Sequence, residues 1–207
     1  MKKLAALILA PVLALSLIAC GGKDKSSTSG GNKSPYASVK TGDTIQLGGY
    51  DWRVLELRDG KALVLSERIL MGRIYNPTDA TWETSDMRRY LNCVFYDNTF
   101  TAEEKAWISE SKIDNNDNPQ FNTSGGGQTE DKVFLLSIEE AKKYFGNDSE
   151  RIALDVNSGR ALWWWLRSPG GRSDRVAGVY NDGGIGVHGY SIRRETGGVR
   201  PALWINL

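Results

Sequence analysis

The last third of the chain carries a group of side chains whose chemistry suits ligand binding. A flat aromatic ring supplies contact area, and amides or carboxylates beside it orient hydroxyl groups, as in many sites for carbohydrates and aromatic ligands. A guanidinium group can also bind a carboxylate or phosphate through charge-assisted hydrogen bonds. We therefore expect a binding surface on the loops between Arg167 and Glu195. The candidate residues are Trp164, Arg172, Asp174, Asn181, Asp182, His188 and Tyr190.

The same residues also fit structural roles. If Trp163, Trp164 and Trp165 lie on one strand, the first and third indoles point to one face and Trp164 points to the other, so at least one face belongs to the core. Whether this run is core or site stays open at the level of sequence. For Arg167 and Arg200, which adjoin apolar strand residues, we predict buried structural ion pairs.

No pattern in the sequence predicts catalysis, a metal ion or a cofactor. His188 is the only histidine, and it has neither the ligand spacing of a zinc site nor a nucleophile elbow elsewhere to act with. The run from Asp114 to Asn118 is rich in oxygen ligands but lacks the fixed glycine and distal glutamate of a calcium-binding EF-hand loop. A solvated turn is favoured there, and the calcium dependence of any binding is left open.

The first twenty residues indicate export and lipidation. Lys2 and Lys3 precede an apolar stretch that ends in Leu17-Ile18-Ala19-Cys20, which has the form of a secretory signal and is too short for a membrane span. The segment Leu17-Ile18-Ala19-Cys20 resembles the lipobox of bacterial lipoproteins. That resemblance implies removal of the signal peptide, residues 1–19, and attachment of acyl chains such as palmitate to Cys20. We expect a lipid-anchored protein on the extracytoplasmic face of the cell membrane.

Composition and charge predict one globular domain after a tether. The 207 residues include 26 Lys and Arg against 25 Asp and Glu, so there is no basic excess to neutralise the phosphates of a nucleic acid, which is therefore not an expected partner. Residues 20–40 comprise the lipidated cysteine and a Gly-, Ser- and Lys-rich tether without apolar periodicity. Residues 41–207 are long enough to form a single domain with its own core.

The patterns within residues 41–207 predict an α+β domain with a mixed, mainly antiparallel sheet and two or three helices. Helices are expected from Ser85, from the capping box at Thr101 and from the capping box at Ser137. The strands are expected at residues 44–47, 51–57, 62–65, 132–136, 163–167, 176–180, 185–188 and 199–205, with turns at Asp59-Gly60 and Asn181-Gly184. We expect the last strand to lie beside the strand that begins near Asp51.

Several segments together resemble a bacterial family catalogued as domain of unknown function 6273. They are Trp52-Arg53-Val54-Leu55, Thr81-Trp82-Glu83, Asp131 to Ser137, Trp164-Trp165-Leu166-Arg167-Ser168-Pro169-Gly170 and Gly198-Val199-Arg200-Pro201-Ala202-Leu203. The resemblance implies no activity. More distantly, a terminal Gly-Val-Arg strand after a Trp-rich strand, two earlier helices and a Gly-rich loop region is similar to C-type-lectin-like folds, although a fold does not transfer function.

The sequence thus favours a surface lipoprotein that binds a glycan, a peptide or another envelope component. An enzyme acting on cell-envelope material is one alternative, and a structural or adaptor protein that pairs with another surface protein is a second. A large exposed aromatic patch between Arg167 and Glu195 would favour binding. A deep pocket holding His188 with a carboxylate would favour the enzyme, and a smooth, self-complementary apolar face would favour the adaptor.

The lipobox gives the first testable prediction. Cys20→Ser should abolish labelling by a palmitate analogue and release the protein from the membrane fraction, because the thioether anchor can no longer form. Metabolic labelling followed by fractionation measures both effects. An unlabelled wild-type chain would contradict the lipoprotein assignment.

Overall fold

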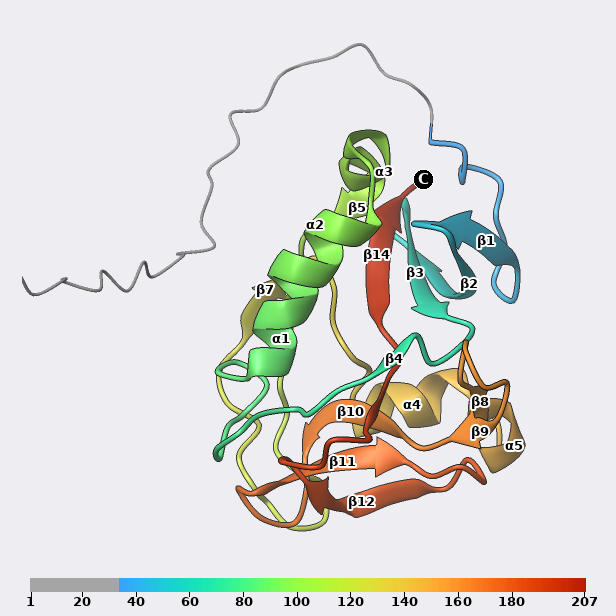
Figure 1. Ribbon diagram of the computed structural model, residues 1–207. Helices are drawn as coiled ribbons and strands as arrows, with labels where there is room; N and C mark the ends of the chain where they lie inside the picture. The colour runs from blue at the N-terminus through green and yellow to red at the C-terminus, as the bar shows by residue number, and fades with distance from the viewer. Residues whose placement is uncertain (1–33) are drawn as a thin grey trace, which may run out of the picture. The chain divides into compact units, whose positions relative to one another are not determined.

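The computed structural model describes residues 34–207 (Figure 1). The predicted signal peptide, Cys20 and the first part of the predicted tether lie outside the described residues. None of the helices in the described part is both long enough and apolar enough to cross a membrane.

Sheet I, as we name it, contains the first strands of the domain and the last one. All its neighbouring strands pair antiparallel. At the hairpin turn between its second and third strands, Asp59 and Gly60 have φ of 51° and 71°, as a two-residue turn of the primed type requires. The strands run in the order β1 (Thr44–Leu47), β2 (Tyr50–Arg58), β3 (Lys61–Ser66), β14 (Ala202–Asn206) and β5 (Ile108–Ser109).

Sheet II carries the tryptophan-rich strand near its centre. Only the pair β10 and β13 is parallel. The order is β12 (Ile185–Ser191), β11 (Arg175–Val179), β10 (Trp164–Pro169), β13 (Gly198–Val199) and β4 (Met71–Gly72). Two short ribbons pair β6 (Ser111–Ile113) with β7 (Thr129–Asp131), and β8 (Ala153–Leu154) with β9 (Ala161–Leu162).

The helices begin where the sequence predicts. Both capping boxes form, with Thr101 and Ser137 each accepting a hydrogen bond from the backbone of the glutamate three residues later. The first helix continues through a π-helical turn. Its parts are α1 (Asp86–Tyr90), η1 (Leu91–Phe95) and α2 (Tyr96–Thr99), followed by α3 (Ala102–Trp107), α4 (Ile138–Tyr144) and the single turn α5 (Asp148–Arg151). The predicted α+β class with mainly antiparallel strands is confirmed, but the strands form two five-stranded sheets and two short ribbons rather than the single sheet expected.

Two strand predictions are wrong. Residues 132–136 form no strand; Val133 to Leu136 are buried, and Phe134 makes one isolated bridge to Ala202. The last strand does not lie beside β2, because the hairpin strand β3 stands between them. The apolar run at 133–136 fills the core as an irregular segment, which a hydrophobic pattern alone does not distinguish from a buried strand.

Two segments of chain pass side by side from one sheet to the other (Figure 1). One connects β3 to β4, and the other connects β13 to β14 through Arg200 and Pro201. Ser66 donates to the carbonyl of Pro201 at 2.9 Å, and Leu70 donates to that of Val199 at 3.0 Å. Pro201, which cannot donate, lies just before β14, as expected of a proline next to a sheet.

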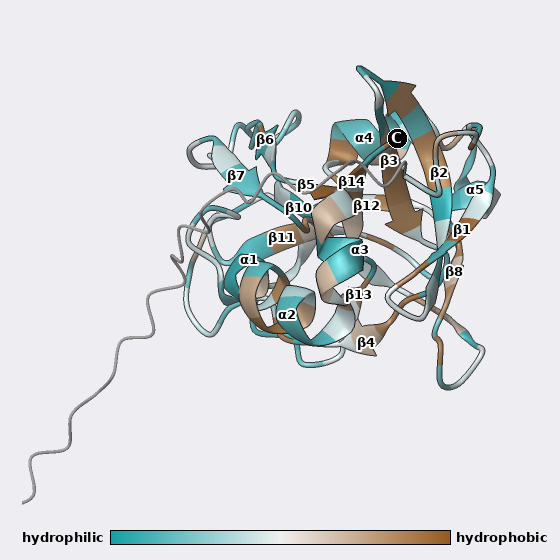
Figure 2. Ribbon diagram, turned by 90° about the horizontal axis from the view of Figure 1, so that it is seen from above, coloured by the Kyte–Doolittle hydropathy of each residue, from teal (hydrophilic) through white to brown (hydrophobic). Residues whose placement is uncertain are grey.

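Arg200 joins the two crossing segments. Its guanidinium is buried, donates to the carbonyl oxygens of Ser66 and Glu67 at 2.8 and 3.4 Å, and lies 5.1 Å from the centre of the Trp164 ring. Burial lowers the pKa of Arg200 to about 9, so the group remains charged at neutral pH. The core around it is continuous from sheet I to sheet II, and Figure 2 shows hydrophobic residues along β3.

The packed domain begins earlier than residue 41. Tyr36 is only 9% exposed, its ring contacts Trp107 edge-on at 5.6 Å, and its hydroxyl donates to the carbonyl of Gln46 at 2.8 Å. Ser34 donates to the carbonyl of Asn206 at 2.8 Å. The described part of the predicted tether, residues 34–40, therefore belongs to the packed domain, because one aromatic side chain is enough to dock an otherwise polar segment. The first described residue and the C-terminal strand are neighbours.

The docking of Tyr36 is testable by one substitution. Tyr36→Ala should lower the free energy of unfolding by about 2–3 kcal/mol, since it removes a mostly buried ring and a hydrogen bond. Chemical denaturation of the full chain measures this loss. Ser38→Ala, at an exposed position nearby, is the control. Equal free energies of unfolding for the two variants would show that residues 34–40 do not stabilise the domain, as expected of a tether that extends to residue 40.

Candidate binding surface

Strand β10 places its tryptophans in different environments. Trp164 is fully buried, and its indole N–H donates to the carbonyl of Arg151 at 3.1 Å. It is therefore a core residue, and the prediction that it contacts a ligand is wrong. Trp165 is also buried, and its indole N–H donates a hydrogen bond to the carbonyl of Arg73 at 2.9 Å. Trp163, just before the strand, is partly exposed.

Trp163 belongs to a group that we call the aromatic cluster, together with Tyr180, Tyr190 and Arg194. The rings of Trp163 and Tyr190 are 4.1 Å apart, and Tyr180 meets Tyr190 edge-on at 5.6 Å. Tyr180 is 38% exposed. These three rings come from the start of β10, the end of β11 and the edge strand β12, so the antiparallel pairing of sheet II brings them together.

Two paired glycines allow close packing at this part of the sheet, one against a tyrosine ring and one against backbone. Gly178 on β11 pairs with Gly186 on β12. A methyl group added to Gly186 would lie 2.6 Å from the Tyr180 ring, whereas one added to Gly178 would lie 2.9 Å from the backbone carbonyl oxygen of Trp164 and at an ordinary contact distance of 3.5 Å from the Tyr190 ring. The absence of a side chain at Gly186 lets the Tyr180 ring lie close to the sheet surface, and its absence at Gly178 lets the β10 backbone approach β11 closely.

Arg194 covers this group from the following loop. Its guanidinium carbon lies 5.1 Å from the centre of the Tyr190 ring and 5.7 Å from that of Trp163. Arg172 and Arg193 are paired with Asp174 and Asp79, whereas Arg194 has no ion-pair partner within residues 34–207. Burial and the neighbouring Tyr180 raise the pKa of Tyr190, which therefore keeps its proton at neutral pH.

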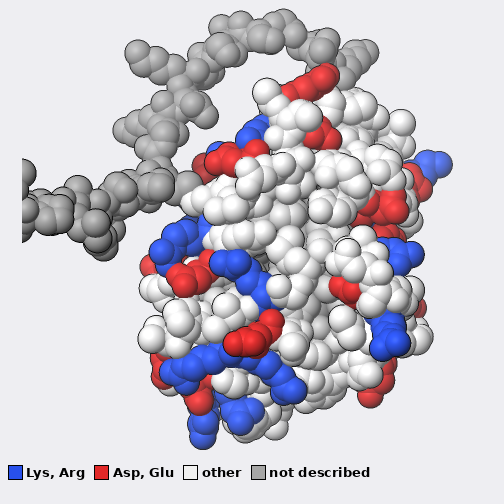
Figure 3. All heavy atoms as spheres, in the orientation of Figure 1, with Lys and Arg blue, Asp and Glu red and all other residues white. Residues whose placement is uncertain are grey.

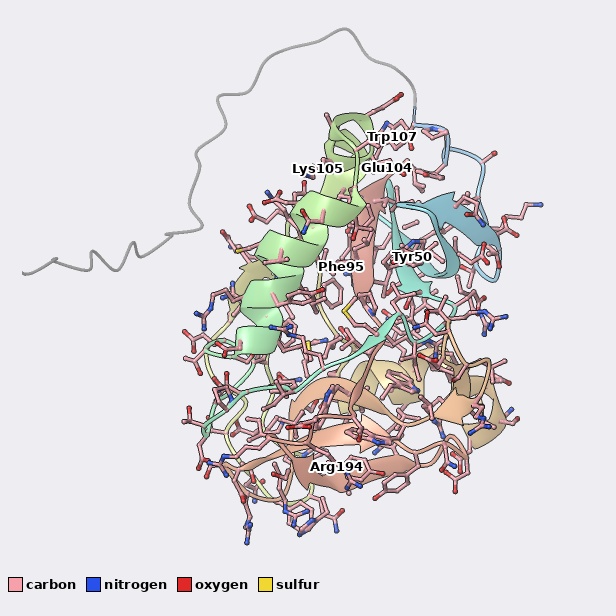
Figure 4. The ribbon with its side chains drawn as sticks, viewed as in Figure 1. Tyr50, Phe95, Glu104, Lys105, Trp107 and Arg194 are labelled. Atoms are coloured by element: carbon pink, nitrogen blue, oxygen red, sulfur yellow. The ribbon has the colours of Figure 1, made fainter. Side chains whose placement is uncertain are left out.

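Charge and position set this end of the domain apart. Figure 3 shows Lys and Arg side chains gathered on the lower part of the face in view. Arg194 lies at that end, over the strands of sheet II, whereas Trp107 and Glu104 lie at the opposite end beside α3 (Figure 4). The aromatic cluster is thus far from the place where Ser34 enters the domain.

A second group, the loop cluster, contains Phe121, His188, Arg172 and Asp174. His188 is exposed on β12, and Phe121 meets it edge-on at 5.4 Å. The His188 carbonyl accepts a hydrogen bond from Gly171 at 2.9 Å. Arg172 donates two hydrogen bonds to Asp174, at 2.8 and 2.9 Å, and these bonds lower the pKa of the Asp174 carboxyl. Arg172 and Asp174 therefore satisfy each other, and both remain accessible.

Asn118 holds the loop that carries Phe121. This side chain is fully buried, and its amide donates to the carbonyls of Pro169 and Val187, both at 2.8 Å. Its oxygen accepts from the backbone of Gln120 and Phe121 at 2.9 and 3.1 Å. The prediction of a solvated turn at 114–118 is therefore wrong for Asn118, which ties the loop to sheet II.

The remaining residues considered in the sequence lie either in an exposed turn or in the buried interior. Asn181 and Asp182 are exposed in the turn between β11 and β12, where Asp182 accepts from the backbone of Gly184 at 3.0 Å. Arg167 is buried and paired with Glu140, as predicted. Arg200 is buried but hydrogen-bonds carbonyl oxygens rather than a carboxylate. Within residues 34–207, no three His, Cys, Asp or Glu side chains meet in a way that could hold a metal ion.

The tertiary structure thus divides the predicted site. Tyr190 joins the aromatic cluster, His188, Arg172 and Asp174 join the loop cluster, and Trp164 joins the core. The structure adds Phe121, Trp163, Tyr180 and Arg194, none of which the sequence singles out as a site residue. Strand alternation already separates Trp163 from Trp164, but nothing local distinguishes the indole that is covered from the one that is not.

The anchoring role of Asn118 can be tested with the single histidine as a reporter. Asn118→Ala should lower the free energy of unfolding by about 2–3 kcal/mol, because buried backbone groups lose their partners, and should shift the imidazole NMR signals of His188 as Phe121 moves away. Asn181→Ala, at an exposed asparagine, should change neither quantity. Unchanged His188 signals in Asn118→Ala would show that the loop is held by other contacts.

Comparison with known proteins places the chain in a family. Neither the curated proteins nor the solved structures give a match. The resemblance noted in the sequence is confirmed over most of its length, since the family model described as Domain of unknown function (DUF6273) matches residues 59–207. The match starts in the β2–β3 turn, after the Trp52-Arg53-Val54-Leu55 segment. The chain belongs to the DUF6273 family.

Proposed function

We propose that the protein is a lipid-anchored, extracytoplasmic binding module that recognises an acidic glycan through the aromatic cluster. The observation that carries this proposal is the grouping of Trp163, Tyr180 and Tyr190 beneath the unpaired guanidinium of Arg194. Aromatic faces pack against the apolar faces of sugar rings, and the phenol groups donate to and accept from hydroxyl groups.

Charge selects the class of glycan. Arg172, which belongs to the loop cluster, and Arg193, which precedes Arg194, already form ion pairs with Asp174 and Asp79. Arg194 therefore offers its donors to a ligand, and a guanidinium group binds a carboxylate through two parallel hydrogen bonds. A uronic acid or another acidic sugar supplies both the ring face and the carboxylate.

The position of the chain entry supports a membrane-anchored arrangement. Ser34 lies beside the last strand, at the end of the domain that holds Trp107 (Figure 4). A tether from a lipidated Cys20 would reach the domain at that end, leaving the aromatic cluster to face away from the membrane. The adjacency of Ser34 and Asn206 also supports the similarity to C-type-lectin-like folds, which we include in the proposal.

Glycan binding tests the proposal directly. On an array of uronic-acid oligosaccharides and neutral oligosaccharides of equal length, the protein should retain the acidic ones. Arg194→Gln should weaken that binding about tenfold and reduce its salt dependence, because one charge contact is lost. Tyr190→Ala should weaken binding to acidic and neutral glycans alike.

Controls separate recognition from stability. Arg68→Gln, an exposed arginine outside the aromatic cluster, should bind as the wild type does, and melting temperatures identify variants that lose their fold. Absence of any bound oligosaccharide, or wild-type binding by both Arg194→Gln and Tyr190→Ala, would contradict the proposal.

A further inference from the structure

We infer that a pocket on sheet I binds a small zwitterion, a molecule about the size of a dipeptide that carries one carboxylate and one ammonium group. The pocket has a volume of about 340 Å³ and is lined by Arg58, Lys61, Glu110, Ser111, Lys112 and Trp204, with Asp59 at its rim. This volume lies at the lower end of the range for small-molecule sites. The pocket is separate from the aromatic cluster, which lies on sheet II.

The pairing of the strands brings the lining residues together. Arg58 faces Lys61 across the β2–β3 hairpin, and Trp204 on β14 faces Ser109 on β5. The segment that follows β5 supplies Glu110 and Lys112. Residues far apart in the sequence thus share one face of sheet I, because β14 lies between β3 and β5.

Trp204 and Arg58 form the flat part of the pocket. The Arg58 guanidinium carbon lies 4.8 Å from the centre of the Trp204 ring, which is 7% exposed. The stacking holds the guanidinium over the indole. A ligand in the pocket therefore meets a charged plane and an apolar edge, rather than open water on all sides.

Two lysines supply positive charge that the protein does not neutralise. The Lys61 ammonium donates to the Ser109 hydroxyl at 2.7 Å and forms no ion pair with the described residues. An ammonium group has three donors, so two remain for a ligand. Lys112 is exposed and has no polar partner within residues 34–207. Together they can hold a carboxylate.

The negative charge in the same pocket is also divided between a paired and an unpaired group. Asp59 lies 4.0 Å from the Arg58 guanidinium, whereas the Glu110 carboxylate has no ion pair within the described part of the chain. Glu110 is one residue from Ser111 and two from Lys112, so a cation-accepting group adjoins the anion-binding lysines. A ligand with both charges matches this lining better than a simple anion, which Glu110 would repel.

Calorimetric titration of the full chain with alanyl-alanine tests the inference, with its N-acetyl derivative and its C-terminal amide as comparisons. The dipeptide should bind, the amide should bind at least about tenfold more weakly, and the N-acetyl form should be weakened to a smaller extent. Lys61→Gln should reduce dipeptide affinity about tenfold, and Lys142→Gln, an exposed lysine on α4, should have no effect.

A second variant distinguishes zwitterion binding from simple anion binding. Glu110→Gln should weaken binding of the dipeptide but leave binding of the N-acetyl form unchanged or stronger. The indole N–H signal of Trp204, identified by its loss in Trp204→Phe, should shift on titration. No heat and no shift at millimolar dipeptide would overturn the inference, as would equal affinity for the dipeptide and its amide.

Discussion

The architecture depends on a buried cation at the junction of two sheets. Arg200 lies where the chain leaves sheet II for sheet I, and it donates to the carbonyls of Ser66 and Glu67 on the neighbouring segment, which crosses in the opposite direction. A guanidinium group suits this position because its fork of donors satisfies several acceptors at once and its faces stack on Trp164 and Phe145. Burying the charge costs free energy, which the carbonyl and aromatic contacts offset.

The same junction determines which surfaces the protein offers. With Trp164 committed to the core beneath Arg200, the opposite face of β10 starts with Trp163, the indole that stays partly exposed. The glycine at 186 then allows Tyr180 to lie close to the sheet beside it, next to Tyr190. The aromatic cluster is therefore a consequence of how sheet II is assembled around its buried tryptophan, and Arg194, which has no ion-pair partner within residues 34–207, adds a positive charge to it.

Sheet I offers a different chemistry. Inserting the C-terminal strand between β3 and β5 brings Trp204 beside Arg58 and Lys61 and forms a charged pocket on that sheet. The two surfaces lie on separate sheets, so a ligand at one need not exclude a ligand at the other. The docking of Tyr36 on Trp107 and the hydrogen bond from Ser34 to Asn206 place the start of the described chain next to this last strand.

Local signals in the sequence determined the hairpin at Asp59-Gly60, the capping boxes at Thr101 and Ser137, and the alternation of the tryptophans, because each depends on neighbours within a few residues. Tertiary structure alone decided that Trp164 is covered, that Tyr36 is docked, and that residues 133–136 remain irregular. It also brought Phe121 to His188, because the Asn118 side chain donates a hydrogen bond to the carbonyl of Val187, 69 positions further along the chain. Burial depends on which distant segment arrives at a given face, and no local pattern carries that information.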